Sequence, residues 1–537
     1  EYDREELERA DAKLSPTARE TMYQQKFHLY RNLTKPSERL YLSFAKAGAS
    51  GEAQNPSYLI NEIRKLFPEI PVRDIEKKEQ PEERLEMPRS GEALFLEELG
   101  KAAEGEIDPL FEELYRWYAA HPEAGIPAET YRKAAFLRCA DGVIGRSAAS
   151  ALYGDTLKNS ATRLEKYAAC AFAHFMEFGL QIRERDQYEL KAADMGTVMH
   201  EALEKFSKKL QENGETWKTV TDDTRDRLIE ECVEETMADY GNTIFQSSSR
   251  NQYRIIRVKR ILKRTVWALQ QQIRQGEFEP GEFEVSFSME DSLSAINIDL
   301  SEHEKMRLRG RIDRVDLCET DDKVYVKIID YKTGNTSLDL VALYYGLQLQ
   351  LAVYLDAAVE LEQKKHPGKQ VEPAGVFYYH IDDPMLDQEE DETDEAWGRR
   401  MLKALRMDGL VNADRKVVEL LDRVLEDGTT SDVIPVGKKK DGSYTSYSKV
   451  ASPEQFDVIR TYTRKKVREI GEGIFSGNVK ISPYQRDGAT ACAYCEYQGI
   501  CGFDQKIQGY EYRKLKGMDT ELLMKAMQEI TQSDQKE

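Results

Sequence analysis

The clearest alternation of apolar and polar positions in this 537-residue chain lies in the segment KVYVKIIDYKTG, residues 323–334. Apolar side chains recur at every second position from Val324 to Ile328, which is the period of a β-strand. Side chains two positions apart on a strand share a face. The pattern therefore predicts a strand that projects Asp330 and Lys332 together at its end, just before a Thr-Gly-Asn turn.

Longer segments show the three- and four-residue spacing of amphipathic helices. In residues 194–210 the apolar positions form one stripe, and His200 lies beside it. Helical patterns also cover residues 93–119, 128–152 and 160–172. The spacing therefore predicts a largely helical stretch of chain before the strand.

The chain divides by pattern into two parts. Residues 1–150 are predicted to be mostly helical, and their charged, proline-containing segment 72–92 is typical of an exposed loop or linker. Gly154-Asp155 precedes a new helix and places a boundary near residue 155. We therefore expect a helical domain over residues 1–150 and a second domain over residues 155–537.

Two carboxylates and a lysine indicate a metal-binding site. Asp313, in the segment GRIDRVDL on the preceding predicted strand, is a candidate ligand beside Asp330. A carboxylate binds a hard divalent cation, and a neighbouring lysine can orient a water molecule or stabilise a developing oxyanion. The residues therefore predict a hydrolytic metal site. Taken singly, each piece has a plainer interpretation, since Asp-Tyr-Lys commonly ends a surface strand and a histidine beside an apolar stripe commonly belongs to the core.

Together and in this order, the motifs resemble the nuclease core of the RecB family, within the PD-(D/E)XK superfamily. The matching positions are His200, Gly310-x-x-Asp313, Asp330-Tyr331-Lys332-Thr333 and Gln350-x-x-x-Tyr354. The resemblance implies an α/β nuclease core with helical surroundings. It also implies Mg2+-dependent hydrolysis of DNA phosphodiester bonds, by an exonuclease that acts on a single strand.

The same resemblance implies a role for each matching residue. The expected ligands of Mg2+ are Asp313, Asp330, His200 and the backbone carbonyl of Tyr331. Lys332 is expected to position the attacking water or to stabilise charge on the phosphorane. Gln350 and Tyr354, one helical turn apart, are expected to orient Lys332 or the strand being cut.

Three of the seven cysteines, Cys492, Cys495 and Cys501, lie close together near the C-terminus. A closed tetrahedral or cubane centre needs four ligands. The candidates for the fourth are Cys139, Cys170, Cys232 and Cys318. Cys232 and Cys318 occupy ordinary helix and strand positions, where a free cysteine is commonly a buried small apolar residue. From the residues alone, zinc is the commoner ion for four cysteines.

The surroundings of Cys170 carry a second resemblance. The segment Arg163-Leu164-Glu165-x-Tyr167-x-x-Cys170-x-Phe172 is similar to the helix that opens the nuclease domain in AddB-type subunits of bacterial helicase–nucleases. In those subunits, and in the CRISPR-associated exonucleases, one cysteine before the nuclease core and three after it hold a [4Fe–4S] cluster.

The resemblance implies that such a cluster is held here by Cys170, Cys492, Cys495 and Cys501, with zinc as the alternative. Ala171 stands where family members often have proline, a departure that leaves the ligand intact. The centre would close a loop of more than three hundred residues. Its loss should therefore loosen the whole nuclease domain.

The N-terminal part resembles superfamily 1 helicases more weakly. Residues 30–42 run from a predicted helix into a predicted apolar strand, as in a motif whose Thr-Arg-Ala segment contacts nucleotide phosphates, but Lys35-Pro36 stands in place of Arg-Ala. No Gly-x-x-x-x-Gly-Lys-[Ser/Thr] loop for a triphosphate occurs in the sequence. We therefore expect a helicase-like remnant.

The absence of an initiator Met predicts a piece of a longer protein. The resemblance implies that this protein is an AddB-type subunit, which pairs with an AddA-type helicase/nuclease and processes DNA double-strand ends in recombinational repair. Two alternatives are a non-catalytic scaffold that binds DNA ends and a freestanding RecB-like exonuclease. The presence of His200, Asp313, Asp330 and Lys332 disfavours the first, and the chain length disfavours the second.

Charge is unevenly distributed along the chain. The net charge of −20 argues against a protein that coats nucleic acid nonspecifically, but it does not exclude a nuclease with a local basic channel. Eight basic residues and no acidic one occur from Arg250 to Arg274, as either a phosphate-contacting surface or a solvated helix face. Lys438-Lys439-Lys440 with Lys449 forms a second basic patch, and the acidic residues 387–395 are predicted to be a solvated, disordered loop.

The remaining bulk properties predict a cytoplasmic protein. The composition, 40% hydrophobic and 32% charged, is ordinary for a soluble protein. No stretch is long and apolar enough to span a membrane, and the charged first residues do not resemble a secretory signal. Seven cysteines are too few for a disulfide-rich secreted scaffold of this length.

Overall fold

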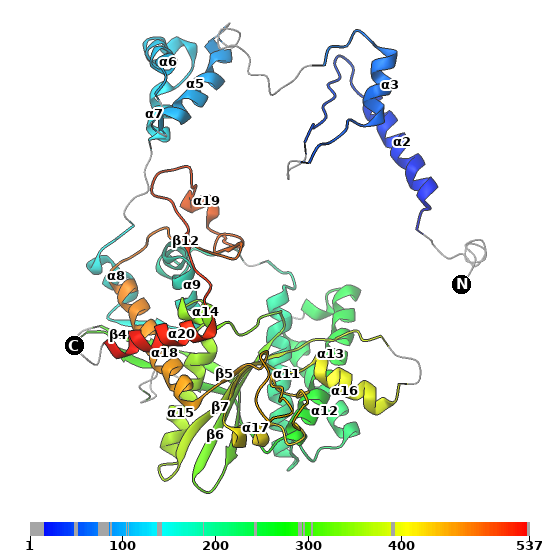
Figure 1. Ribbon diagram of the computed structural model, residues 1–537, viewed down its shortest axis with the longest axis vertical. Helices are drawn as coiled ribbons and strands as arrows, with labels where there is room; N and C mark the ends of the chain where they lie inside the picture. Colours follow the sequence, from blue (N-terminus) through cyan, green and yellow to red (C-terminus); the bar gives the residue numbers. More distant parts are fainter. Residues whose placement is uncertain are drawn as a thin grey trace. The chain divides into compact units, whose positions relative to one another are not determined.

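The computed structural model describes residues 15–47, 52–72, 85, 88–103, 105, 107–136, 142–185, 187–240, 244–287, 293, 296–301, 304–387 and 392–533 (Figure 1). The chain falls into two compact units, residues 1–129 and 130–537. This division lies before the boundary expected near residue 155. The reason is that the intervening chain joins the second unit, where the backbone N–H of Ile144 donates to the carbonyl of Gly477 over 2.9 Å.

The first unit is helical in its described residues. Its helices are α2 (Ala18–Thr34), α3 (Tyr58–Leu66), α5 (Pro88–Ala103) and α6 (Pro109–Ala120). The ring of Phe95 in α5 stacks on Phe111 of α6 at 6.1 Å and packs against Tyr118 at 5.3 Å. The segment 93–119 therefore forms two helices, because Pro109 is suited to the first position of a new helix.

The apolar strand expected after α2 does not form. Residues 35–45 carry no strand pairing, and the nearest β-contact of the described chain is an isolated bridge between Ala47 and Ala53. A strand needs a neighbour to satisfy its backbone groups, and the described residues supply none at this place. Cys139, residues 388–391 of the acidic loop and most of the linker expected over 72–92 lie outside the described residues.

The second unit is built on a six-stranded mixed sheet in the order β2-β5-β6-β7-β8-β9. The strands are β2 (Glu279–Phe287), β5 (Gly310–Glu319), β6 (Lys323–Lys332), β7 (Gln370–His380), β8 (Asp408–Asn412) and β9 (Val450–Ala451). Strand β6 confirms the strand predicted from the alternating pattern. It pairs antiparallel with β5 and parallel with β7, so it lies inside the sheet.

Helices cover both faces of this sheet (Figure 1). On one face, α11 (Ala192–Glu212), α12 (Asp222–Asp239) and α13 (Ser249–Gln275) share a core with Tyr325 and Ile329 of β6. On the other, α15 (Gln350–Lys365) and α18 (Pro453–Phe475) share a core with Val326 and Ile328. The helix predicted over residues 194–210 is confirmed within α11. Helix α15 is also the crossover that the parallel strands β6 and β7 require.

The chain contains further, shorter elements, of which η1 belongs to the first unit and α7 spans the division between the two units. The helices are α7 (Ala128–Ala135), α8 (Arg146–Tyr153), α9 (Ala161–Ala169), α10 (Ala171–His174), α14 (Leu340–Tyr344), α16 (Asp394–Ala404), α17 (Arg415–Leu421), α19 (Gln498–Cys501) and α20 (Thr520–Ser533), with the short turns η1 (Pro122–Ala124), η2 (Phe175–Gly179) and η3 (Ile244–Gln246). The short strands are β1 (Thr156–Asn159), β3 (Asn297–Asp299), β4 (Lys305–Leu308), β10 (Tyr484–Arg486), β11 (Ala489–Thr490) and β12 (Arg513–Lys514).

Two of the predicted helices are interrupted. Between α7 and α8, Gly142 adopts a left-handed φ of +66°, which ends any continuous helix over 128–152. Between α9 and α10, Cys170 is extended, with φ −162°. None of the helices in the described ranges is both long and apolar enough to cross a membrane.

Candidate active site

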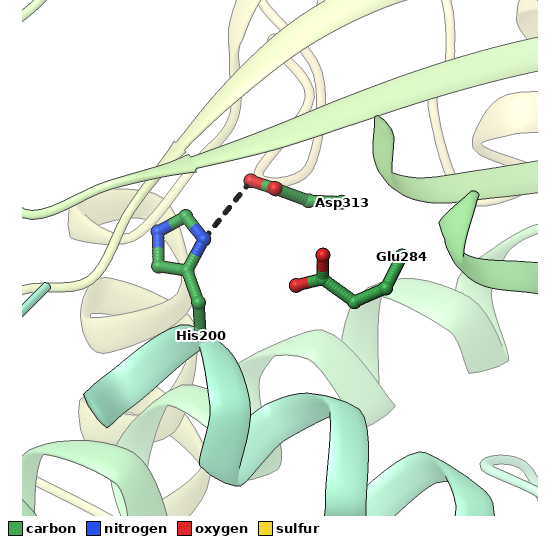
Figure 2. A group of neighbouring side chains, drawn as sticks. All are labelled: His200, Glu284 and Asp313. Carbon is green, nitrogen blue, oxygen red and sulfur yellow. Dashed lines mark ion pairs between the residues drawn. The ribbon is translucent and has the colours of Figure 1, made fainter. Parts of the chain in front are cut away.

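Two carboxylates and an imidazole converge where β2, β5 and α11 meet (Figure 2). One ligand atom each from His200, Glu284 and Asp313 lie within 4.8 Å of one another. Nδ1 of His200 is 3.3 Å from Oδ2 of Asp313, the pair joined in Figure 2. In the part of the chain that the structure describes, this is the one group of three such ligands, and its oxygen and nitrogen atoms suit a divalent cation.

Helix α11 presents His200 to the carboxylates. Burial lowers the pKa of His200, but the hydrogen bond to Asp313 and the charges of Asp313 and Asp330 outweigh burial, so its pKa is raised. Its ring meets that of Tyr331 at 5.8 Å with an interplanar angle of 86°. The neighbouring carboxylates thus favour positive charge at this position.

Glu284 is a member of this group that the sequence interpretation missed. It lies on β2, next to Asp313 of the antiparallel strand β5. Its φ of +51° is strained for a residue other than glycine, and such strain often marks a functional position. Burial, followed by the charge of Asp313, raises the pKa of Glu284 to about 7. Its only signal in the sequence is an acidic residue between Phe283 and Val285, which does not reveal its neighbours.

Asp330 and Lys332 lie on the same side of β6, as their spacing predicted. Nζ of Lys332 is 2.5 Å from Oδ2 of Asp330 and donates to Oε1 of Gln350 over 3.0 Å. Gln350 donates in turn to the hydroxyl of Tyr354 over 3.1 Å. Burial, followed by the charge of Asp313, raises the pKa of Asp330 to about 6. The structure therefore joins all four residues in one series, with Asp330 outside the 4.8 Å group of Figure 2.

Two of the carboxylates direct a buried oxygen atom at a cationic side chain. Oδ2 of Asp330 forms an ion pair with Lys332, and Oε2 of Glu284 forms one with Arg311. A carboxylate oxygen has a second lone pair, and carboxylate oxygens are ligands for Mg2+. The donor set therefore fits a divalent cation.

A buried ion network supports the site from the other side of β5. The backbone N–H of Tyr331 donates to Oδ2 of Asp313 over 2.7 Å. The fully buried Arg314 donates to both carboxylate oxygens of Asp316 over 2.6 and 2.8 Å and also contacts the hydroxyl of Tyr331. Lys327 lies 3.2 Å from Asp316 and balances the network. The network fixes Tyr331, and its N–H fixes the Asp313 carboxylate. A role for the Tyr331 carbonyl stays a prediction.

Helix α9 also reaches this region. Oε1 of Glu165 accepts the backbone N–H groups of Leu349 over 2.6 Å and Gln350 over 3.0 Å, at the start of α15. A carboxylate at a helix N-terminus satisfies free donors and complements the helix dipole. Glu165 therefore holds the residue that accepts a hydrogen bond from Lys332.

Four cysteines come together at a second place. The pocket that they line also contains Tyr497, and its cysteines are Cys170, Cys492, Cys495 and Cys501. Cys232 and Cys318 are instead buried in the core shared by α11, α12 and α13. Of the described cysteines, Cys170 is therefore the one that joins the C-terminal three.

The surroundings of these thiols fit a negatively charged centre. The backbone N–H of Phe503 donates to Sγ of Cys501 over 3.5 Å, and that of Tyr497 donates to Cys495. Burial raises the pKa of Cys495, whereas the N–H of Tyr497 and the charge of Lys166 act against burial and favour the thiolate. Four thiols that line one pocket can hold either a zinc ion or an iron–sulfur cluster.

The basic residues of α13 fall into two sets. Four of them form the ion pairs Lys259–Glu234, Lys263–Glu230, Arg260–Asp383 and Arg264–Asp383. Arg274 donates to two backbone carbonyl groups. Arg250, Arg254 and Arg257 have no ion-pair partner among the residues that the structure describes. Pairing within the protein thus accounts for only some of the basic residues in α13.

The second basic patch is largely engaged within the protein. Lys438 is buried, and Lys449 forms an ion pair with Asp408. The exposed lysines at this place are Lys439 and Lys440. Contact of this loop with nucleic acid stays a prediction.

Comparison with known proteins agrees with this architecture. The sequence pattern of the PD-(D/E)XK nuclease superfamily matches residues 158–502, which include both the carboxylate site and the four cysteines. The α/β nuclease fold expected from the motifs is thereby confirmed.

Curated relatives extend the similarity to nearly the whole chain. The B-subunit of the ATP-dependent helicase/deoxyribonuclease from Lachnoclostridium phytofermentans is 42% identical over 519 residues, which cover 95% of this chain and 44% of that protein. The proteins of the same name from Alkaliphilus metalliredigens and Clostridium tetani are 34% and 32% identical, and each alignment covers 99% of this chain and 46% of the relative. The chain thus spans about half the length of the curated relatives that it matches.

Proposed function

The chain belongs to the PD-(D/E)XK nuclease superfamily, and we propose that it hydrolyses DNA phosphodiester bonds with the help of Mg2+. The observation that carries the proposal is the meeting of Asp313, Asp330 and Lys332 with His200 at one end of the central strands. Similar proteins are named as the B-subunit of an ATP-dependent helicase/deoxyribonuclease. We assign to this chain the nuclease-bearing part of such a protein.

The ligands of the metal are the acidic and imidazole groups at this end of the sheet. We assign to the Mg2+ shell the residues Asp313, Asp330, His200 and the carbonyl of Tyr331, with Glu284 as an additional carboxylate. When bound, the ion supplies Lewis acidity and makes a coordinated water more acidic. Burial and the charge of Asp313 raise the pKa of both Asp330 and Glu284, and a cation would offset these effects and favour the ionised carboxylates.

Lys332 acts on the reacting groups. Its ammonium group lies beside Asp330, where it can orient the attacking water or stabilise the charge that develops on the phosphorane. Gln350 accepts a hydrogen bond from it, and Tyr354 holds the amide of Gln350. This pair fixes the direction in which Lys332 presents its charge.

We further propose that the reaction is exonucleolytic cleavage of a single strand, at double-strand ends that are processed for recombinational repair. The names of the relatives describe one subunit of a larger enzyme, which supports a heterodimer with an AddA-type helicase/nuclease as the other member. We also propose a cytoplasmic location, because the named relatives come from bacteria, in which the DNA lies in the cytoplasm.

We propose that the four-cysteine pocket holds a [4Fe–4S] cluster. Its support is the meeting of Cys170 with three C-terminal cysteines and the backbone donors that face two of them. The pocket is lined by a different set of residues from the carboxylate site. Its cysteines join α9 to the C-terminal segment and take no part in hydrolysis.

The test of the nuclease assignment is Asp330→Asn, which keeps the size of the side chain and removes the metal-binding charge. Cleavage of end-labelled single-stranded DNA in Mg2+ should fall about 100-fold or more. The absorbance of the cysteine centre should be unchanged. Asp322→Asn, an exposed carboxylate just before β6 at the opposite end of that strand, is the matched control and should cleave normally. Equal cleavage by both variants would remove Asp330 from the site.

A further inference from the structure

The described part of α13 exposes cations that the protein itself does not neutralise. Arg250, Arg254 and Arg257 lie at spacings of four and three residues, so they share one face of the helix. Tyr253 and Ile256 are 64% and 65% exposed beside them. We call these five residues the arginine strip. Three guanidinium groups without an ion pair in the described chain are a clear exception in a protein of net charge −20.

The position of α13 ties one end of the strip to the candidate active site. Farther along the helix, Arg264 pairs with Asp383, which follows β7. Strand β7 runs parallel to β6, with His380 opposite Lys332. Asp383 therefore marks the end of the sheet at which the nuclease residues lie. The strip begins about 10 Å along the helix from Arg264, at Arg257, and continues toward the start of α13.

The other end of the strip is tied to the helix that carries the site histidine. Asn251 of α13 donates to the carbonyl of Ile244 in η3 over 3.0 Å. Just before η3, Tyr240 donates to Asp194 in the first turn of α11 over 2.9 Å. Both ends of the strip are thus linked to elements that build the site. A ligand that leaves the site along this side of the sheet would pass over α13.

We propose that the arginine strip binds the single-stranded DNA that the site cuts, an inference that rests on the proposed function. Guanidinium groups bind phosphate through paired N–H donors. An exposed tyrosine among cations is the pattern of surfaces on which unpaired bases stack, whereas duplex bases are hidden from such contact. Arg250, Arg254 and Arg257 contact successive phosphates, and Tyr253 stacks on a base.

The experiment measures binding separately from cleavage. A fluorescent single-stranded oligonucleotide is titrated with the whole chain in EDTA at several salt concentrations. In the triple variant Arg250→Gln/Arg254→Gln/Arg257→Gln, the slope of log affinity against log salt should become shallower by about 2, the value for three lost phosphate contacts. Tyr253→Ala should weaken binding about tenfold with no change in slope, because it removes stacking and no charge.

A matched control removes the same charge elsewhere. Arg415→Gln/Lys416→Gln/Arg423→Gln alters exposed positions at and after the start of α17, which follows β8 at the opposite end of the sheet. This variant should bind with the original slope. A strip variant whose slope matches that of the control would overturn the proposal. So would an unchanged affinity for DNA accompanied by lost affinity for polyglutamate, which would assign the strip to an acidic protein surface.

Hydrolysis of a small phosphodiester, bis(p-nitrophenyl) phosphate, separates this proposal from the nuclease assignment. Hydrolysis of that substrate needs the metal site but no surface that binds DNA, so the strip variant should hydrolyse it at the rate of the unaltered chain. If Asp330→Asn lost hydrolysis while the strip variant kept the salt slope of the unaltered chain, DNA binding by the arginine strip would be rejected and the nuclease assignment would stand. Retained hydrolysis in Asp330→Asn would reject the nuclease assignment itself.

Discussion

At the scale of single residues, the site contains carboxylates whose ionised form is disfavoured by the fold alone. Burial and the charge of Asp313 raise the pKa of Asp330 to about 6 and that of Glu284 to about 7. Glu284 also adopts a strained φ of +51°. A cation would relieve the repulsion among these groups, so the cost is consistent with a site arranged for a ligand rather than for stability.

Glu284→Gln should therefore stabilise the metal-free protein at pH 8. The folded pKa lies above the ordinary value of 4.5, so the native state binds more protons than the unfolded chain between about pH 4.5 and 7. Stability from this group is present at low pH and is lost as pH rises through about 7. The variant avoids that loss, and we expect a gain of about 1 kcal/mol after allowing for solvent screening and for the lost ion pair with Arg311.

Urea denaturation in EDTA at pH 8 and pH 5 measures this effect. The midpoint should rise for Glu284→Gln at pH 8 and rise much less at pH 5, where the carboxyl is still neutral in the folded protein. Glu282→Gln, two positions earlier on β2, is the control and should show no such pH dependence. An equal gain at both pH values would mean that the pKa of Glu284 is not raised by the fold.

The difference between Asp330 and Glu284 also shows what the sequence could predict at this scale. Asp330 is recognisable because Lys332 follows it on the same strand at the spacing of one face. Glu284 belongs to another strand, and its approach to Asp313 depends on the register between β2 and β5 and on a left-handed backbone. Neither the register between these strands nor the left-handed backbone can be predicted from the neighbouring residues in the sequence. The sequence therefore predicts site residues that are close along the chain better than those joined by strand pairing.

At the scale of elements, β6 and α11 were predictable because each carries a regular apolar period over its length. The strand expected after α2 failed because strand formation depends on a partner, which apolar character alone does not supply. The long helices expected in the first part are broken at Pro109 and Gly142, residues whose local preferences were visible but outweighed by the helical pattern. The spacing of apolar residues predicts whether a segment is a helix or a strand, and the segments that pack against it decide whether that element forms.

The contact between α9 and α15 gives a prediction at this scale. Glu165→Ala removes the acceptor for two backbone N–H groups, so the unfolding free energy should fall by about 1–2 kcal/mol. Because the first residue of α15 is Gln350, which contacts Lys332, the rate of DNA cleavage should also fall. Urea denaturation and the cleavage rate at saturating DNA measure the two effects, and Glu165→Gln should retain most of both.

Asp414→Ala separates the two effects. Asp414 caps α17 by accepting the N–H of Lys416 over 2.9 Å, away from the nuclease residues. It should cost similar stability and leave cleavage at saturating DNA unchanged. If both alanine variants reduced cleavage alike, the loss would reflect stability, and the contact of Glu165 with α15 would have no separate influence on Lys332.

At the scale of the whole chain, the four-cysteine pocket connects segments that are more than three hundred residues apart. The sequence indicates three of its members through their closeness, and only a resemblance selects Cys170 as the fourth. The fold supplies the physical reason: α9 packs beside α18, and the chain after α18 returns to the end of α9. Cys232 and Cys318 lie in the core of α11–α13 and Cys170 lies in the four-cysteine pocket, a difference that depends on the tertiary fold.

Because all four cysteines would hold one centre, replacing any of them should have the same effect. Cys170→Ser and Cys501→Ser should each lose the bound iron, and the double variant should be no less stable than either single variant. Strongly coupled ligands show such non-additivity, because the first substitution already removes the shared interaction. Iron content, absorbance after anaerobic purification and the urea midpoint measure these outcomes. Cys232→Ala, in the separate core of α11–α13, is the control and should keep its iron. Additive losses of stability with iron retained would show that Cys170 and Cys501 do not share a centre, whereas one zinc per chain would keep the shared centre and reject the cluster.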